Sequence, residues 1–195
     1  MNSTNKPLKA DFDELRERVR VGRELNYASF EPIFYLVFDP ARIIEMKRQT
    51  PVLISALKKD GWQVHTLSMV EEVASLIAND PRQKLWDIVD RRDPMNWQKT
   101  NDAIGNALTS TGALLNRVDA KLSDLEGKPN QLLLVTDLEA LHPYMRVGAI
   151  EGQLQGKFHV PTVFLYPGTR TGKTQLRFLG FYSEDGNYRS VHIGG

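Results

Sequence analysis

The sequence predicts an α/β fold, in which a mostly parallel sheet is flanked by helices. Three apolar runs, at 33–38, 131–136 and 160–166, have the composition of strands that are buried on both faces. Between these runs the apolar residues recur at helical spacing. Strands that alternate with helices in this way form a parallel sheet, because the connecting helices cover its two faces.

The first part of the chain alternates between helix and strand. Residues 8–22 carry apolar side chains at helical spacing, and the first strand ends at Asp39-Pro40, a pair typical of a helix start. The helix that follows is expected to be interrupted at Thr50-Pro51, since proline removes a backbone donor. Residues 62–67 alternate between apolar and polar and predict a second strand.

The middle and the end of the chain differ in character. Residues 69–127 hold a block of helical patterns with no strand, and we interpret them as a helical insertion. The runs 176–181 and 187–193 alternate and are rich in arginine and aromatic residues. They predict a C-terminal antiparallel hairpin that extends the sheet at one edge.

Composition restricts the class of protein. A chain of 195 residues is expected to form a single domain, with residues 1–7 disordered. It has no cysteine, so disulfides and cysteine-ligated metals are excluded. The 25 basic and 24 acidic residues are spread evenly, which does not favour dedicated nucleic-acid binding. With no apolar run long enough to cross a membrane, we expect a cytoplasmic protein.

Two aspartates follow predicted strands. Asp39 and Asp137 stand at the carboxyl ends of parallel strands, where ligand clefts of such sheets open. If their strands are neighbours, the two carboxylates can share a metal site. The alternative is that both are helix caps, or that Asp137 is a partner of Arg146.

A glycine-rich stretch at 168–174 invites comparison with a phosphate-binding loop. Three residues separate Gly168 from Gly172-Lys173-Thr174, whereas the phosphate loop requires four. The stretch also precedes a predicted strand and not a helix, whose amides would bind phosphate. We therefore expect at most a degenerate NTPase-like scaffold without a phosphate loop, and assign no catalytic residue, cofactor or metal.

Arginine and aromatic residues gather on the last predicted strands and their loops. Such residues are enriched at protein interfaces. An ordinary charged edge hairpin and a stacking surface for single-stranded nucleic acid are the alternatives. The candidate partner-binding residues are Arg146, Tyr166, Arg170, Arg177, Tyr188 and Arg189.

The last third of the chain carries an ordered series of motifs. They are Thr136-Asp137, His142-Pro143-Tyr144 with Arg146, Val160 to Gly168, Leu176 to Gly180, and Asn187-Tyr188-Arg189. Together with the opening Phe38-Asp39-Pro40, their order resembles the BrxB domain family of bacteriophage-exclusion (BREX) defence systems. The resemblance implies an accessory component of a phage-resistance system that marks host DNA by methylation. It supplies no catalytic residue, and the partner it implies is the alkaline-phosphatase-like PglZ component.

The function expected from these observations is that of a non-enzymatic adaptor subunit in an antiviral defence complex. Two alternatives stay open. One is a divergent nucleotide- or metal-dependent enzyme that uses Asp39 and Asp137, and the other is a weak nucleic-acid binder.

Overall fold

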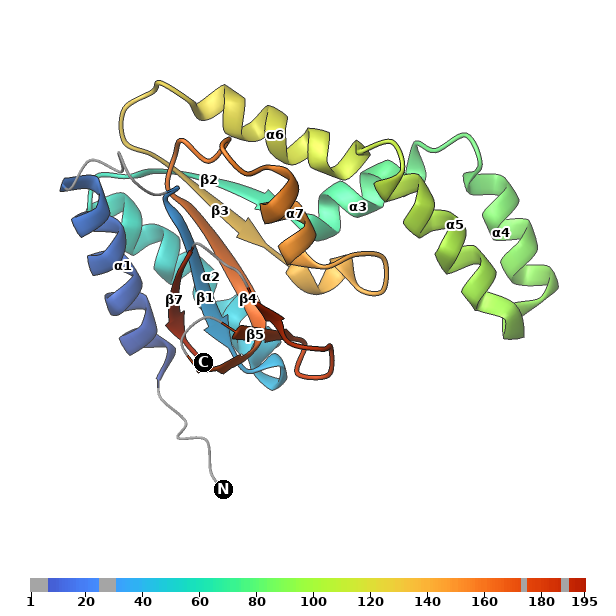
Figure 1. Cartoon of the computed structure of the whole chain (residues 1–195), viewed down its shortest axis with the longest axis horizontal. Coiled ribbons are helices and arrows are strands. Elements are labelled where there is room, and N and C mark those ends of the chain that lie inside the picture. Colours follow the sequence, from blue (N-terminus) through green and yellow to red (C-terminus); the bar gives the residue numbers. More distant parts are fainter. Residues whose placement is uncertain (1–6, 25–30, 173–174, 187–189) are drawn as a thin grey trace.

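The computed structural model describes residues 7–24, 31–172, 175–186 and 190–195. It contains a sheet whose main path has five parallel strands in the order β2-β3-β4-β1-β7 (Figure 1). These strands are β1 (Ile33–Phe38), β2 (Gln63–Ser68), β3 (Gln131–Thr136), β4 (Thr162–Thr171) and β7 (Val191–Gly194). The predicted α/β class with a mostly parallel sheet is confirmed.

Helices cover both faces of this sheet, so its central strands are buried throughout. Along β1, Phe34 and Leu36 belong to one apolar core, while Tyr35 and Val37 belong to the other. This alternation is the two-residue period of a strand placed between two layers. It explains why the run at 33–38 is continuously apolar.

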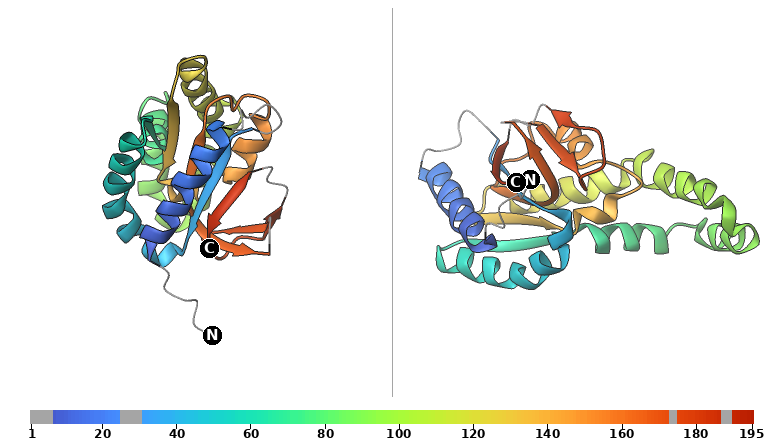
Figure 2. Two further views of the ribbon diagram at one scale, coloured as in Figure 1. Left: turned by 90° about the vertical axis from the view of Figure 1, so that its left-hand side faces the viewer. Right: turned by 90° about the horizontal axis from the view of Figure 1, so that it is seen from below.

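The two cores belong to different sets of helices (Figure 2). One core is closed by α1 (Leu8–Glu24) and α2 (Ile43–Lys59). The other is closed by α3 (Met69–Ala78), α6 (Ala113–Leu125) and α7 (Val147–Gln153). The fold is therefore a three-layer sandwich of helix, sheet and helix.

Helix α2 corrects the expected break at Thr50-Pro51, because it runs unbroken through Pro51. The Thr50 hydroxyl does not cap a new helix. It donates to the Met46 carbonyl at 2.8 Å, a bond that a threonine inside a helix makes to the preceding turn.

The block at 69–127 is helical, as predicted, and has two parts. Helices α3 and α6 lie on the sheet and contribute to its core. Between them, α4 (Gln83–Arg92) and α5 (Trp97–Thr109) form a helical hairpin that projects away from the sheet (Figures 1 and 2).

The C-terminal strands add an antiparallel hairpin, but its partners differ from those expected. β4 continues past the sheet to Thr171 and pairs antiparallel with β5 (Gln175–Phe178), which pairs in turn with β6 (Asp185–Gly186). The expected pairing of 176–181 with 187–193 is wrong. Residues 187–189 lie outside the described residues. Strand β7 pairs parallel with β1, along the edge of β1 that faces away from β4.

Candidate functional site

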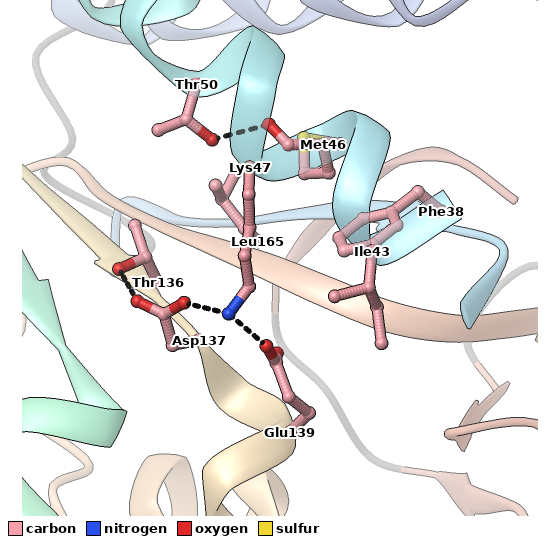
Figure 3. A pocket seen from close by; sticks show the side chains of 9 residues that line it. All are labelled: Phe38, Ile43, Met46, Lys47, Thr50, Thr136, Asp137, Glu139 and Leu165. Atoms are coloured by element: carbon pink, nitrogen blue, oxygen red, sulfur yellow. Dashed lines mark hydrogen bonds and ion pairs between the residues drawn. The ribbon is translucent and has the colours of Figure 1, made fainter. Parts of the chain in front are cut away.

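The carboxyl ends of the parallel strands surround a cavity of about 230 Å³ (Figure 3). Ligand sites of open α/β sheets form at this edge. Its wall combines apolar and charged side chains from α2 and from three strands and their following loops. They are Phe38, Ile43, Met46, Lys47, Thr50, Thr136, Asp137, Glu139 and Leu165.

Lys47 links helix α2 to the segment after β3. Its ammonium lies 2.7 Å from a carboxylate oxygen of Asp137 and 2.8 Å from one of Glu139 (Figure 3). The hydrogen bond with Asp137, followed by that with Glu139, raises the pKa of Lys47 despite its partial burial. The amine is therefore charged at neutral pH and is not a nucleophile in this arrangement.

Asp137 is held by three donors. Its carboxylate accepts from the Ser68 hydroxyl at 2.8 Å and from the Thr136 hydroxyl at 2.7 Å, in addition to Lys47. Burial raises the pKa of Asp137, but the hydrogen bonds from Lys47, Thr136 and Ser68 outweigh burial, and the pKa lies below its usual value. Through these contacts the Asp137 carboxylate connects the ends of β2 and β3 with helix α2.

Both expected roles of Asp137 are wrong. Its side chain makes no capping bond to the short 3-10 helix η3 (Leu138–Leu141), because Asp137 adopts a left-handed backbone with φ of 58°. The expected partner Arg146 instead donates to the Ser183 hydroxyl at 2.9 Å. The carboxylate lines the cavity and joins a polar network with Ser68, Thr136 and Lys47.

Asp39 caps a helix, as one of the two alternatives predicted. Its carboxylate accepts from the Ala41 amide at 2.9 Å and begins the 3-10 helix η1 (Pro40–Arg42). Strand β4 lies between β1 and β3, so Asp39 and Asp137 stand on strands about 10 Å apart, at about 4.8 Å per strand. Across the described ranges no group of three or more histidine, aspartate or glutamate side chains is placed to hold a metal ion.

A second group of side chains joins the segment after η3 to the turn after β5. We call it the aromatic cluster, and it consists of His142, Arg146, Phe181 and Tyr182. The Phe181 and Tyr182 rings are stacked at 4.7 Å between centroids, and the His142 ring meets both edge-on. The Arg146 guanidinium lies 5.1 Å from the centre of the Tyr182 ring.

The aromatic cluster is ordered internally but open to solvent. Burial raises the pKa of Tyr182, and the Arg146 charge opposes this only in part, so the phenol keeps its proton at neutral pH. This phenol hydrogen-bonds Nδ1 of His142. Phe181 remains 65% exposed, although its ring is fixed by stacking. The arrangement presents a rigid aromatic surface beside a permanent positive charge.

The other candidate partner-binding residues are dispersed. Arg170 is exposed and donates to the backbone carbonyls of Gly172 and His192, while Arg177 is paired with Glu184 at 3.1 Å. Tyr188 and Arg189 lie outside the described residues. Of the four candidates that lie within the described residues, the structure therefore brings Arg146 alone into the aromatic cluster, together with Phe181 and Tyr182.

Tyr166 is a correction, because its side chain is 1% exposed and belongs to the core. Its ring packs against Tyr35 and against Phe178, at centroid distances of 5.5 Å in both cases. The β4–β5 hairpin places Phe178 over the end of β4, so the aromatic side chain that follows the apolar run is covered. Tyr166 is therefore unavailable to a partner in this fold.

Two functional-site residues had no distinguishing signal in the sequence. Lys47 is one of several charged residues on α2, and its partners lie about 90 positions later. His142 is an isolated histidine whose contact with Tyr182 depends on the β4–β5 hairpin. Neither contact follows from a local pattern.

None of the helices searched within the described residues is both long enough and apolar enough to span a bilayer. Comparison with known proteins found no matching curated protein and no matching solved structure. The family model described as BREX protein BrxB matches residues 66–193, which include the end of β2, the helical block, β3, β4 and the aromatic cluster. The match covers well over half of the chain, and the chain therefore belongs to the BrxB family, a component of BREX defence systems.

Proposed function

We propose that this chain is a non-enzymatic adaptor that binds a larger subunit of its BREX system through the aromatic cluster. The observation that carries the proposal is the exposed Phe181 ring, held in place by Tyr182 and His142 beside the Arg146 guanidinium. Aromatic and arginine side chains dominate interface hot spots, since they combine apolar area with polar tips. Rings that are already fixed lose little freedom on binding.

The strand-end acids favour the adaptor over the enzyme alternative. Asp137 accepts from Ser68, Thr136 and Lys47, and Asp39 accepts from the Ala41 amide at the start of η1. Both carboxylates thus have a structural role, and β4 separates the strands that carry them. The chemistry of the defence system is accordingly assigned to another subunit, and the PglZ-like component is the partner we propose.

Co-purification with each of the other proteins of the system tests this proposal. The variant combines Phe181→Ala with Arg146→Ala. A matched control combines Val52→Ala with Arg48→Ala, which removes an exposed apolar residue and an exposed arginine from α2. Loss of hot-spot side chains often costs about 2 kcal/mol or more, so the complex should weaken at least roughly tenfold.

The control should bind as the unchanged protein does, and circular dichroism should report the same fold for all three. Retention of the PglZ-like protein by the unchanged chain and its loss by the cluster variant support the proposal. If the unchanged chain retains no protein of the system, the adaptor function is refuted. If both variants bind equally, the aromatic cluster is not the interface.

A further inference from the structure

Helix α4 carries an exposed face that the fold does not use. Lys84, Leu85, Ile88, Arg91 and Arg92 are all exposed. At about 100° per residue they fall within about 120° of the helix circumference, so they form one continuous face. We call it the α4 face. Leu85 and Ile88 are 57% and 61% exposed, which is unusual for two adjacent apolar residues on one helix side.

The packing of α4 within the chain does not account for this face. The helix packs against α5, and its buried residue is Trp86, which is 7% exposed and lies under the Arg82 guanidinium at 5.4 Å. Trp86 occupies a different side of the helix from Leu85 and Ile88, about 100° and 160° away. Neither Leu85 nor Ile88 is therefore part of the core.

The apolar exposure continues past the end of α4. Met95, in the connection to α5, and Trp97, the first residue of α5, are 88% and 53% exposed. This connection forms the tip of the projecting hairpin (Figure 1). Exposed apolar residues that gather on a projecting element are typical of a surface completed by another molecule.

Charge on the α4 face has one sign. Lys84, Arg91 and Arg92 have no ion-pair partner in the part of the chain that the structure describes. Of the two acidic residues of the helix, Asp90 lies on the side away from Ile88 and Leu85, whereas Asp87 borders the face about 40° from Arg91 and accepts from Gln83. The face thus presents aliphatic side chains bordered by three cations.

We propose that the α4 face binds an acidic amphipathic helix of another protein. Apolar residues at three- and four-residue spacing in that helix cover Leu85 and Ile88, and its aspartates and glutamates pair with the three cations. Nucleic acid fits less well, because phosphates leave the two aliphatic side chains exposed. A second copy of this chain fits less well too, because a two-fold contact places the three cations opposite their own counterparts.

This inference goes beyond the proposed function, since it concerns a surface distinct from the aromatic cluster. The test uses the full chain, fluorescently labelled, on overlapping peptides that cover every other protein of the system. The bound peptides are expected to be acidic, with apolar residues at helical spacing. Their affinities are then measured in solution by fluorescence polarisation, at low and at physiological salt.

Two variants and one control separate the contributions. Leu85→Gln with Ile88→Gln should weaken peptide binding at least roughly tenfold. Lys84→Glu with Arg91→Glu and Arg92→Glu should weaken it similarly and remove its salt dependence. The control, Ile44→Gln with Arg48→Glu, changes exposed residues of α2 and should bind normally. Circular dichroism should confirm folding of each variant.

Several results would overturn the inference. They are the absence of any acidic amphipathic peptide among those bound, or equal affinity of both α4 variants and the unchanged chain. The class of partner is wrong if the variants instead lose binding to a DNA duplex, to vesicles containing phosphatidylserine, or to a second copy in sedimentation. The Phe181→Ala and Arg146→Ala variant should keep peptide binding, so failure of the α4 face and failure of the aromatic cluster are distinguishable.

Discussion

The substitution Asp137→Asn tests the polar network at the carboxyl edge of the sheet. Asparagine has nearly the same shape and, like aspartate, tolerates the left-handed backbone that this position adopts. The change therefore removes the negative charge and replaces one carboxylate oxygen with an NH2 donor, without imposing backbone strain. One side-chain oxygen faces the Ser68 and Thr136 hydroxyls and the other faces Lys47, and an amide can satisfy only one of these sides as an acceptor.

The expected loss follows from these contacts. Lys47 is almost half exposed, so its ion pair with Asp137 contributes at most about 1 kcal/mol. Each hydroxyl bond to a carboxylate exceeds its neutral counterpart by about 0.5–1 kcal/mol. We expect Asp137→Asn to lower the free energy of unfolding by about 2 kcal/mol at neutral pH. The control Glu139→Gln removes only the more exposed pair and should cost about 0.5 kcal/mol.

Urea unfolding followed by circular dichroism, from neutral pH down to about pH 3, measures both effects. The folded pKa of Asp137 lies below its unfolded value. Its stabilisation is therefore complete above the unfolded pKa, near 4, and is lost as pH falls through the folded pKa. The difference in free energy of unfolding between the unchanged chain and Asp137→Asn should become smaller in acid. A difference that is below 0.5 kcal/mol, or that does not depend on pH, contradicts the assigned network.

Three further predictions concern the same edge and the charge of the chain. Gly168→Ala should destabilise the protein by about 1–3 kcal/mol in urea unfolding, because an added Cβ would lie 2.4 Å from the Arg177 carbonyl oxygen; an unchanged midpoint would contradict the β4–β5 contact. Asp39→Ala should cost about 1 kcal/mol through loss of the η1 cap and leave partner binding intact; loss of binding in a folded variant would instead indicate a functional carboxylate. DNA binding in gel shifts should be weak and vanish by physiological salt, since the net charge is +1; a retained complex would refute this.

The layered sheet is the part of the fold that local sequence predicts well. The run at 33–38 is apolar at every position, because its alternate side chains enter two different cores. Its end at Asp39-Pro40 was also predictable, since a cap and a proline at the first helical position act within a few residues. Such elements depend on neighbours in sequence, which a pattern can record.

Strand pairing and the polar network depend on distant contacts and were mispredicted or missed. The runs at 176–181 and 187–193 each overlap a strand, β5 and β7, although residues 179–181 form a turn and 187–189 lie outside the described residues. Which strand each one joins is decided by the extension of β4 and the free edge of β1. Many lysines and arginines could have paired with Asp137 as far as the sequence shows. Lys47 is its partner because α2 packs beside the end of β3, and that packing depends on the whole fold. Tyr166 was misassigned for the same reason, since only the fold reveals that Phe178 covers it.

The position of the internal network bears on how the two proposed surfaces work together. Asp137 and Glu139 hold the start of the segment that carries His142 and Arg146, so the Lys47 contacts fix the base of the aromatic cluster. The α4 face stands on a separate hairpin, in which Trp86 of α4 is buried and Leu108 of α5 contributes to the core. A subunit with one rigid surface beside the sheet and another on a projecting arm has the geometry to hold two proteins at once. Such linkage raises the effective concentration of one partner near the other without any catalysis by the adaptor.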